Sequence, residues 1–169
     1  FCQNHNIAIG KAGSPISLER LRDIFFELEE AGANNINLVT PTHYVPQIAK
    51  VLKRIKNKSL NIPVVYNTSS YENVGTLMMM NNLVDIYLAD LKYYDDELAL
   101  KYSFCTDYFE TATMAIDEMY RQVGGLQVSE DGLLKKGVIV RVLILPGHIE
   151  DAKNIINYLY KTFGDSIII

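Results

Sequence analysis

Four short segments of the sequence combine residue types that could bind a polar ligand or move a proton. They are Thr40-Pro41-Thr42-His43, Asn67-Thr68-Ser69-Ser70, Asp90-Leu91-Lys92 and the single residue Arg141. Together they offer hydroxyl, imidazole, amide, carboxylate, ammonium and guanidinium groups. A site built from such groups could hold a ligand that carries a ribose, a carboxylate and an amine.

Each segment also has a purely structural interpretation. Thr-Pro-Thr and Asn-Thr-Ser-Ser form turns and helix caps well, and a lone histidine such as His43 is more often hydrogen-bonded and neutral than a ligand. Asp90 and Lys92 are two residues apart, so on a strand they point to the same face. Arg141 interrupts an apolar run, so its guanidinium needs a carboxylate or ligand partner unless it lies near the surface.

The elements that position these segments alternate along the chain. Apolar runs predict strands at 35–40, 62–67, 84–90, 138–145 and 167–169. Apolar residues at helical spacing predict helices at 17–31, through 48–55, and at 72–80, 96–102, 107–122 and 152–163. The polar stretch 128–136 is expected to be a loop.

This alternation predicts an α/β fold with a parallel sheet covered by outer helices. Periodicity alone leaves two alternatives, an open doubly wound sheet and part of a barrel. A bare strand at 167–169 favours a partial (β/α) barrel, in which residues 1–169 form a single domain truncated at both ends. In either fold the active site lies beyond the carboxyl ends of the strands, which is where the polar segments are expected.

Composition narrows the class of protein. The chain has 169 residues and a formal net charge of -4, which argues against a general nucleic-acid binder because phosphate contacts call for a basic face. No apolar run approaches the roughly 20 residues that cross a bilayer, so no membrane association is expected. Two cysteines, Cys2 and Cys105, do not make the pattern of a disulfide-rich secreted domain. A reducing cytoplasm is therefore expected, with Cys105 as a free thiol.

Six motifs match a known family in order along the chain. They are Phe1-Cys2-Gln3-Asn4 and the segments 37–44, 64–69, 85–93, 118–124 and 141–147. Together they resemble the radical S-adenosylmethionine (SAM) proteins related to the pyruvate formate-lyase activating enzyme. The resemblance covers almost the whole chain.

The resemblance implies a fold of the radical SAM barrel type and a [4Fe-4S] cluster held by three cysteines. Phe1-Cys2 matches the last aromatic-cysteine pair of that cluster loop, which makes Cys2 the expected metal ligand. The other two cysteines would lie upstream of residue 1, so the chain as it stands is expected to be inactive. The implied reaction is reductive cleavage of SAM to a 5'-deoxyadenosyl radical. The implied partners are a flavodoxin or ferredoxin-type reductant and a glycyl-radical enzyme such as pyruvate formate-lyase.

The resemblance also assigns roles to single residues. The expected cofactor-binding residues are Asn4, Thr40, Thr42, His43, Asn67, Thr68 and Asp90, and the expected catalytic residues are Lys92 and Arg141. Thr40-Pro41-Thr42 stands where family members have a Gly-Gly-Glu-like segment near the methionine amine of SAM.

Two other hypotheses belong to different functional classes. A non-catalytic binding or interaction protein would keep the barrel and lack the cluster. A metal-free barrel enzyme for a phosphorylated metabolite is less favoured, because no glycine-rich phosphate cradle precedes a helix.

Overall fold

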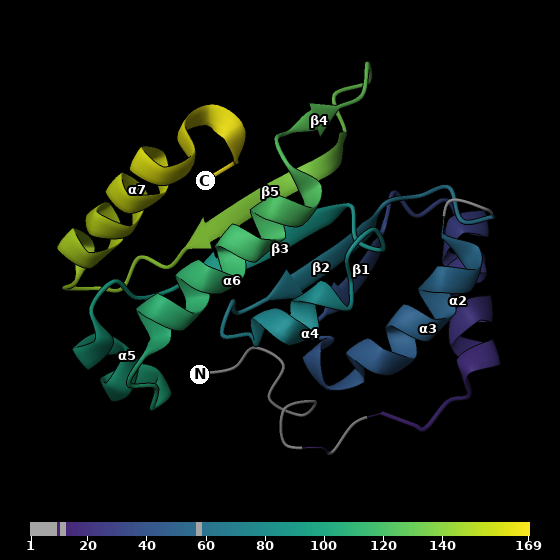
Figure 1. Ribbon diagram of the computed structural model, residues 1–169, viewed down its shortest axis with the longest axis horizontal. Coiled ribbons are helices and arrows are strands. Elements are labelled where there is room, and N and C mark those ends of the chain that lie inside the picture. The colour runs from purple at the N-terminus through teal and green to yellow at the C-terminus, as the bar shows by residue number, and fades with distance from the viewer. Residues whose placement is uncertain (1–9, 11–12, 57–58) are drawn as a thin grey trace.

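The computed structural model describes residue 10 and residues 13–56 and 59–169. Its helices are α2 (Leu18–Glu30), α3 (Val45–Ile55), α4 (Val74–Met78), α5 (Asp96–Ser103), α6 (Tyr108–Val123) and α7 (Ile149–Phe163), with the short 3-10 helices η1 (Thr42–Tyr44) and η2 (Gly164–Ser166) (Figure 1). Its strands are β1 (Ile36–Val39), β2 (Val64–Thr68), β3 (Ile86–Leu91), β4 (Gln127–Val128) and β5 (Leu134–Val142). The predicted alternation of strands and helices is confirmed.

The five strands form one sheet in the order β1-β2-β3-β5-β4. The neighbours β1, β2, β3 and β5 are parallel, and only β4 runs antiparallel to its neighbour β5. The parallel strands therefore follow one another in space as they do in sequence. Within the described residues the sheet is not closed, because β1 and β4 lie on opposite edges.

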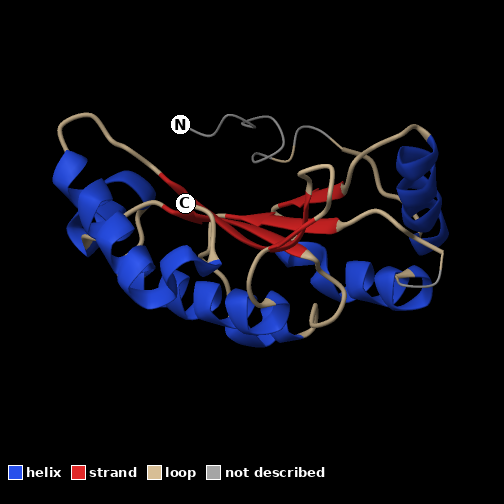
Figure 2. Ribbon diagram, turned by 90° about the horizontal axis from the view of Figure 1, so that it is seen from above, coloured by secondary structure: helices blue, strands red, loops and turns tan. Residues whose placement is uncertain are grey.

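The helices gather along one face of the sheet (Figure 2). Alternate strand residues point to that face and are buried, among them Leu38, Tyr66, Tyr87 and Val140. The rings of Tyr66 and Tyr87 lie side by side across β2 and β3, with their centroids 5.6 Å apart. The core thus lies between the sheet and the helices, where apolar burial stabilises the fold.

The opposite face of the sheet, called here the open face, has a different composition. The strand residues that point to it are Asn37, Val39, Val65, Asn67, Ile86, Leu88, Asp90, Ile139 and Arg141. Val39 is 55% exposed although it lies in a strand. Among these residues Asn37, Val39 and Arg141 are exposed, whereas Val65 and Ile86 are buried. In the described residues no helix packs on this face (Figure 2).

The prediction of a loop at 128–136 is confirmed for residues 129–133 and wrong for the residues on either side. Residues 127–128 and 134–136 pair as an antiparallel hairpin, and β5 begins at Leu134. A turn closes the hairpin, in which the N–H of Gly132 donates to the carbonyl of Ser129 at 2.9 Å. Its strands carry exposed polar residues such as Lys135 on a projecting edge, which removes the apolar pattern that predicts a strand.

Two other predicted elements are shorter in the structure. The helix expected at 72–80 is a single turn over Val74–Met78, whose first turn is capped by the Asn73 side chain. The strand expected at 167–169 is one parallel bridge between Ile168 and Ile139. The N–H of Val140 donates to the carbonyl of Ile168 at 2.8 Å, so these residues extend the β5 edge in the predicted parallel direction.

No helix of the described residues has the length and apolar character needed to cross a membrane.

Position 137 in β5 requires a glycine, both for its backbone conformation and for the close approach of Leu126. Its φ is +141°, and a Cβ there would lie 2.8 Å from the Leu126 Cδ2 and 3.3 Å from the Leu126 Cα. The Leu126 side chain would have to move, and the Leu126 backbone would have to shift by a few tenths of an ångström. We expect Gly137→Ala to lower the free energy of unfolding by about 2–4 kcal/mol, from overpacking and strain together.

Urea denaturation of the two proteins measures this difference. Gly125→Ala is the control, because a Cβ at Gly125 meets no atom within 4 Å and should change stability by no more than about 0.5 kcal/mol. Equal effects of the two substitutions would contradict the steric explanation.

Candidate functional site

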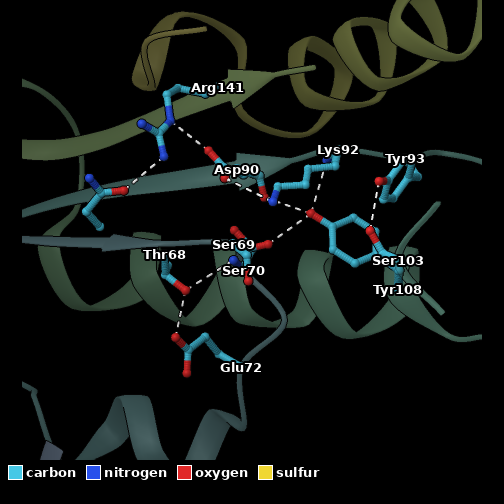
Figure 3. Close-up of polar contacts among 11 residues, drawn as sticks. Thr68, Ser69, Ser70, Glu72, Asp90, Lys92, Tyr93, Ser103, Tyr108 and Arg141 are labelled. Atoms are coloured by element: carbon cyan, nitrogen blue, oxygen red, sulfur yellow. Dashed lines mark hydrogen bonds and ion pairs between the residues drawn. The ribbon is translucent and has the colours of Figure 1, made fainter. Parts of the chain in front are cut away.

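An ion pair between β3 and β5 lies at the centre of the candidate site (Figure 3). Asp90 and Arg141 are partners in the register of these two strands. The Arg141 Nε donates to the Asp90 Oδ1 at 2.6 Å. This confirms that the arginine in the apolar run has a carboxylate partner. Its side chain is also 49% exposed, so it lies at the surface as well.

Two further predicted residues join this pair. The Arg141 Nη2 donates to the Asn67 Oδ1 at 2.9 Å, which links β5 to β2 across β3. The Lys92 Nζ lies 3.6 Å from the Asp90 Oδ2. One carboxylate therefore lies between two cations, and the cluster of Asn67, Asp90, Lys92 and Arg141 keeps a formal charge of +1.

The cluster retains hydrogen-bonding capacity for a ligand. A guanidinium has five N–H donors, and within the described part of the chain Arg141 uses only Nε and Nη2. The Lys92 side chain is 29% exposed. A ligand carboxylate that approached the open face would therefore meet an arginine already oriented by Asp90 and Asn67.

Apolar side chains lie beside the cluster on the same face. Val39 and Leu88 are the register partners of Asn67 on either side of β2. Ile139 precedes Arg141 by two residues and therefore points to the same face. The open face thus places a charged cluster next to apolar surface, as a ligand with a polar end and an aromatic end requires.

Thr42 and Thr68 belong to a second cluster, on the helix side of the sheet. Both hydroxyls donate to the Glu72 Oε1 at 2.6 Å. The Tyr66 hydroxyl donates to the same oxygen at 3.3 Å, and burial raises the pKa of this phenol above its ordinary value. These hydrogen bonds connect η1 to the carboxyl end of β2, so both threonine hydroxyls are engaged away from the Arg141 cluster.

Glu72 itself is almost fully buried, with only 4% of its surface exposed. Among the residues that the structure describes, its Oε2 and the Ser70 Oγ have no hydrogen-bond partner. Buried polar atoms without a partner are uncommon and costly. Glu72 therefore marks a polar spot beneath the strand ends that nothing in its local sequence predicts.

The backbone is strained where β1 and β2 end. Thr40 has φ of 50° and Ser70 has φ of 64°. Residues other than glycine rarely adopt such values, and β-branched residues such as threonine adopt them least. The Thr40 N–H still donates to the Asn67 carbonyl at 2.8 Å, and its side chain is exposed. His43 follows in η1 and is exposed too. Strained residues of this kind cluster at functional sites.

The remaining predicted site residues, Cys2 and Asn4, lie outside the described residues. Cys105 is the cysteine that the structure describes, and its Sγ donates to the Ser103 carbonyl at 3.4 Å. In the described ranges no three His, Cys, Asp or Glu residues come together as metal ligands. These residues alone therefore do not fit a [4Fe-4S] cluster, which needs several thiolates.

Comparisons with known proteins give no activity for this chain. No protein-family model matches the chain. Over 141 residues it is 26% identical to an uncharacterized protein of Methanocaldococcus jannaschii, a match that takes in 80% of this chain and 36% of that protein. The chain therefore spans little more than a third of the length of this relative. Because the relative is uncharacterized, a function for this chain has to be inferred from its own residues.

Proposed function

We propose that the chain is the SAM-binding part of a radical SAM enzyme, with the Arg141 cluster as the site for the methionine end of SAM. The observation that carries the proposal is the Arg141 guanidinium, oriented by Asp90 and Asn67 at the carboxyl end of parallel strands. Lys92 completes the set. The order of the motifs along the chain supports the same family.

The architecture supports a partial (β/α) barrel of this family. Four parallel strands follow in consecutive order, and the helices cover one face of the sheet (Figure 2). A doubly wound sheet reverses its strand order and carries helices on both faces. In a partial barrel the open face becomes the inner face, which places Asn67, Asp90 and Arg141 inside.

The donor set fits SAM. Arg141 and Lys92 would bind the ligand carboxylate, since both are cations with N–H groups available on the open face. Asp90 would accept from the ligand amine, and its negative charge would offset the sulfonium. Val39, Leu88 and Ile139 would cover apolar parts of the ligand. A reduced [4Fe-4S] cluster beside this site would supply one electron to the sulfonium of bound SAM, which would break the C–S bond and give methionine and a 5'-deoxyadenosyl radical.

The [4Fe-4S] cluster would be held by residues outside those that the structure describes. Cys2 would supply one thiolate, and two further cysteines would have to precede it in the natural protein. A cytoplasmic location, a flavodoxin or ferredoxin-type reductant and a glycyl-radical enzyme partner belong to the same proposal. They come from the family resemblance alone.

Anaerobic reconstitution tests the activity. The natural protein, expressed with any residues that precede Phe1 and supplied with iron, sulfide, SAM and a strong reductant, should develop cluster absorption and release 5'-deoxyadenosine. A natural sequence without the two upstream cysteines, or reconstituted protein that cleaves no SAM, would reject the proposal. SAM binding without cleavage would instead support a non-catalytic binding protein.

Arg141→Gln tests the binding site directly. We expect the dissociation constant for SAM, measured by calorimetry, to rise about 10- to 100-fold, because a charge-assisted hydrogen bond to the ligand is lost. Arg22→Gln is the matched control, since Arg22 is also half exposed and paired with an aspartate, Asp23. Equal affinities of the wild-type and Arg141→Gln proteins would place the SAM site elsewhere.

A further inference from the structure

The sheet divides at the carboxyl ends of its central strands. The register of β2 and β3 ends at the pair Thr68 and Ala89. In contrast, β3 stays paired with β5 for two more residues, as far as Leu91 and Val142. The next residues of β2 and β3 therefore part beside Asp90, where the candidate site lies.

The Tyr108 hydroxyl lies where the two strands part (Figure 3). It lies 2.9 Å from the Ser69 carbonyl and 3.1 Å from the Asp90 carbonyl, either of which can accept its proton. It also accepts a hydrogen bond from the Lys92 N–H at 3.0 Å. One phenol oxygen thus takes the place of the backbone hydrogen bonds that would otherwise continue the β2–β3 ladder.

The rest of Tyr108 is held rigidly. Its side chain projects from the first turn of α6 and is 2% exposed. The ring stacks on Tyr71 and meets the edge of Tyr93, at centroid distances of 6.2 and 5.3 Å. Burial raises the pKa of the Tyr108 phenol above its ordinary value. A tyrosine hydroxyl is protonated at neutral pH, so this one can donate to a carbonyl there.

The contacts connect α6 to Asp90 in β3 and to Lys92, which follows β3. Asp90 is held through its carbonyl and Lys92 through its N–H, while Ser69 is two residues beyond Asn67. We infer that Tyr108 is a positioning residue, which sets the spacing between Asn67 and the Asp90–Lys92 pair and thereby the affinity for SAM. The inference rests on the proposed function for its ligand, but its structural part does not.

Tyr108→Phe removes the hydroxyl and keeps the ring. The Lys92 N–H then loses its acceptor at the strand end. We expect the SAM dissociation constant to rise about tenfold, and hydrogen exchange at the Lys92 amide to become about tenfold faster. Tyr93→Phe is the matched control. Tyr93 is fully buried beside Tyr108, but its hydroxyl bonds to Ser103, so both quantities should stay within about twofold of wild type.

The outcomes separate the inference from the proposed function. Unchanged affinity and unchanged Lys92 exchange in Tyr108→Phe would overturn the inference, as would equal changes in Tyr93→Phe. If the wild-type protein binds no SAM, the proposed function fails. In that case faster Lys92 exchange in Tyr108→Phe alone still supports the positioning role, and equal exchange in both variants refutes it.

Discussion

Replacement of Asp85 by alanine is expected to lower the free energy of unfolding by about 3–5 kcal/mol, a large share of the 5–15 kcal/mol that holds an ordinary domain folded. Asp85 pairs with the Lys56 ammonium, whose side chain is only 8% exposed. The same carboxylate accepts from the Val64 N–H at 2.7 Å. The substitution leaves a buried ammonium and a backbone N–H without their acceptor.

Asp85 lies far from the Arg141 cluster, so its replacement should change stability and not ligand binding. It immediately precedes β3, and its carbonyl accepts from the Gly137 N–H at 3.0 Å. It therefore connects the amino ends of β2 and β3 to the point where β5 begins to pair with β3. The Arg141 cluster lies at the opposite, carboxyl end of these strands. We therefore expect ligand affinity of the folded fraction to be unchanged.

Urea denaturation measures the loss of unfolding free energy, provided that the slope of this free energy against urea concentration is the same for both proteins. Asp23→Ala is the control, because Asp23 is half exposed and pairs with an equally exposed Arg22, so its loss should cost no more than about 0.5 kcal/mol. Adding Lys56→Met to Asp85→Ala should restore part of the stability, since it removes the uncompensated charge. A loss under about 1 kcal/mol would show that the pair is hydrated rather than buried.

The sequence predicted the elements that bury a face. The helix expected at 107–122 is α6 at Tyr108–Val123, because Ala112, Ile116 and Met119 repeat at helical spacing and all face the core. The hairpin made by β4 and the first residues of β5 carries no such pattern, because its residues are largely exposed. Hydrophobic periodicity arises from a buried face, so it does not reveal an element that buries little on either face.

The site was predictable in part for a similar reason. An arginine in an apolar strand needs an acid, and Asp90 supplies it at the matching register position. Glu72 and Tyr108 escaped because their partners come from other elements, such as the Thr42 hydroxyl and the Ser69 carbonyl. A tyrosine at an apolar position of an amphipathic helix looks like an ordinary core residue, and the local sequence does not indicate which group its hydroxyl contacts.

Asp90→Asn is expected to have the largest effect on ligand binding, a loss of about 100-fold in affinity for SAM. The substitution keeps the shape of the side chain and removes the charge that lies between Arg141 and Lys92. The formal charge of the cluster rises from +1 to +2, and the sulfonium of SAM adds a further positive charge to the site. An amide also presents an N–H where the lysine ammonium needs an acceptor.

Calorimetry of the variants separates the loss of charge from the loss of Arg141 orientation. If Asp90 acts by orienting Arg141, then Asp90→Asn combined with Arg141→Gln should cost less than the sum of the two single substitutions, because the two side chains form one unit. Glu150→Gln, which removes a charge from an exposed pair with Lys153, should change the affinity by no more than about twofold. Additive effects would mean that Asp90 and Arg141 meet the ligand independently, and the ion pair would then have no part in binding.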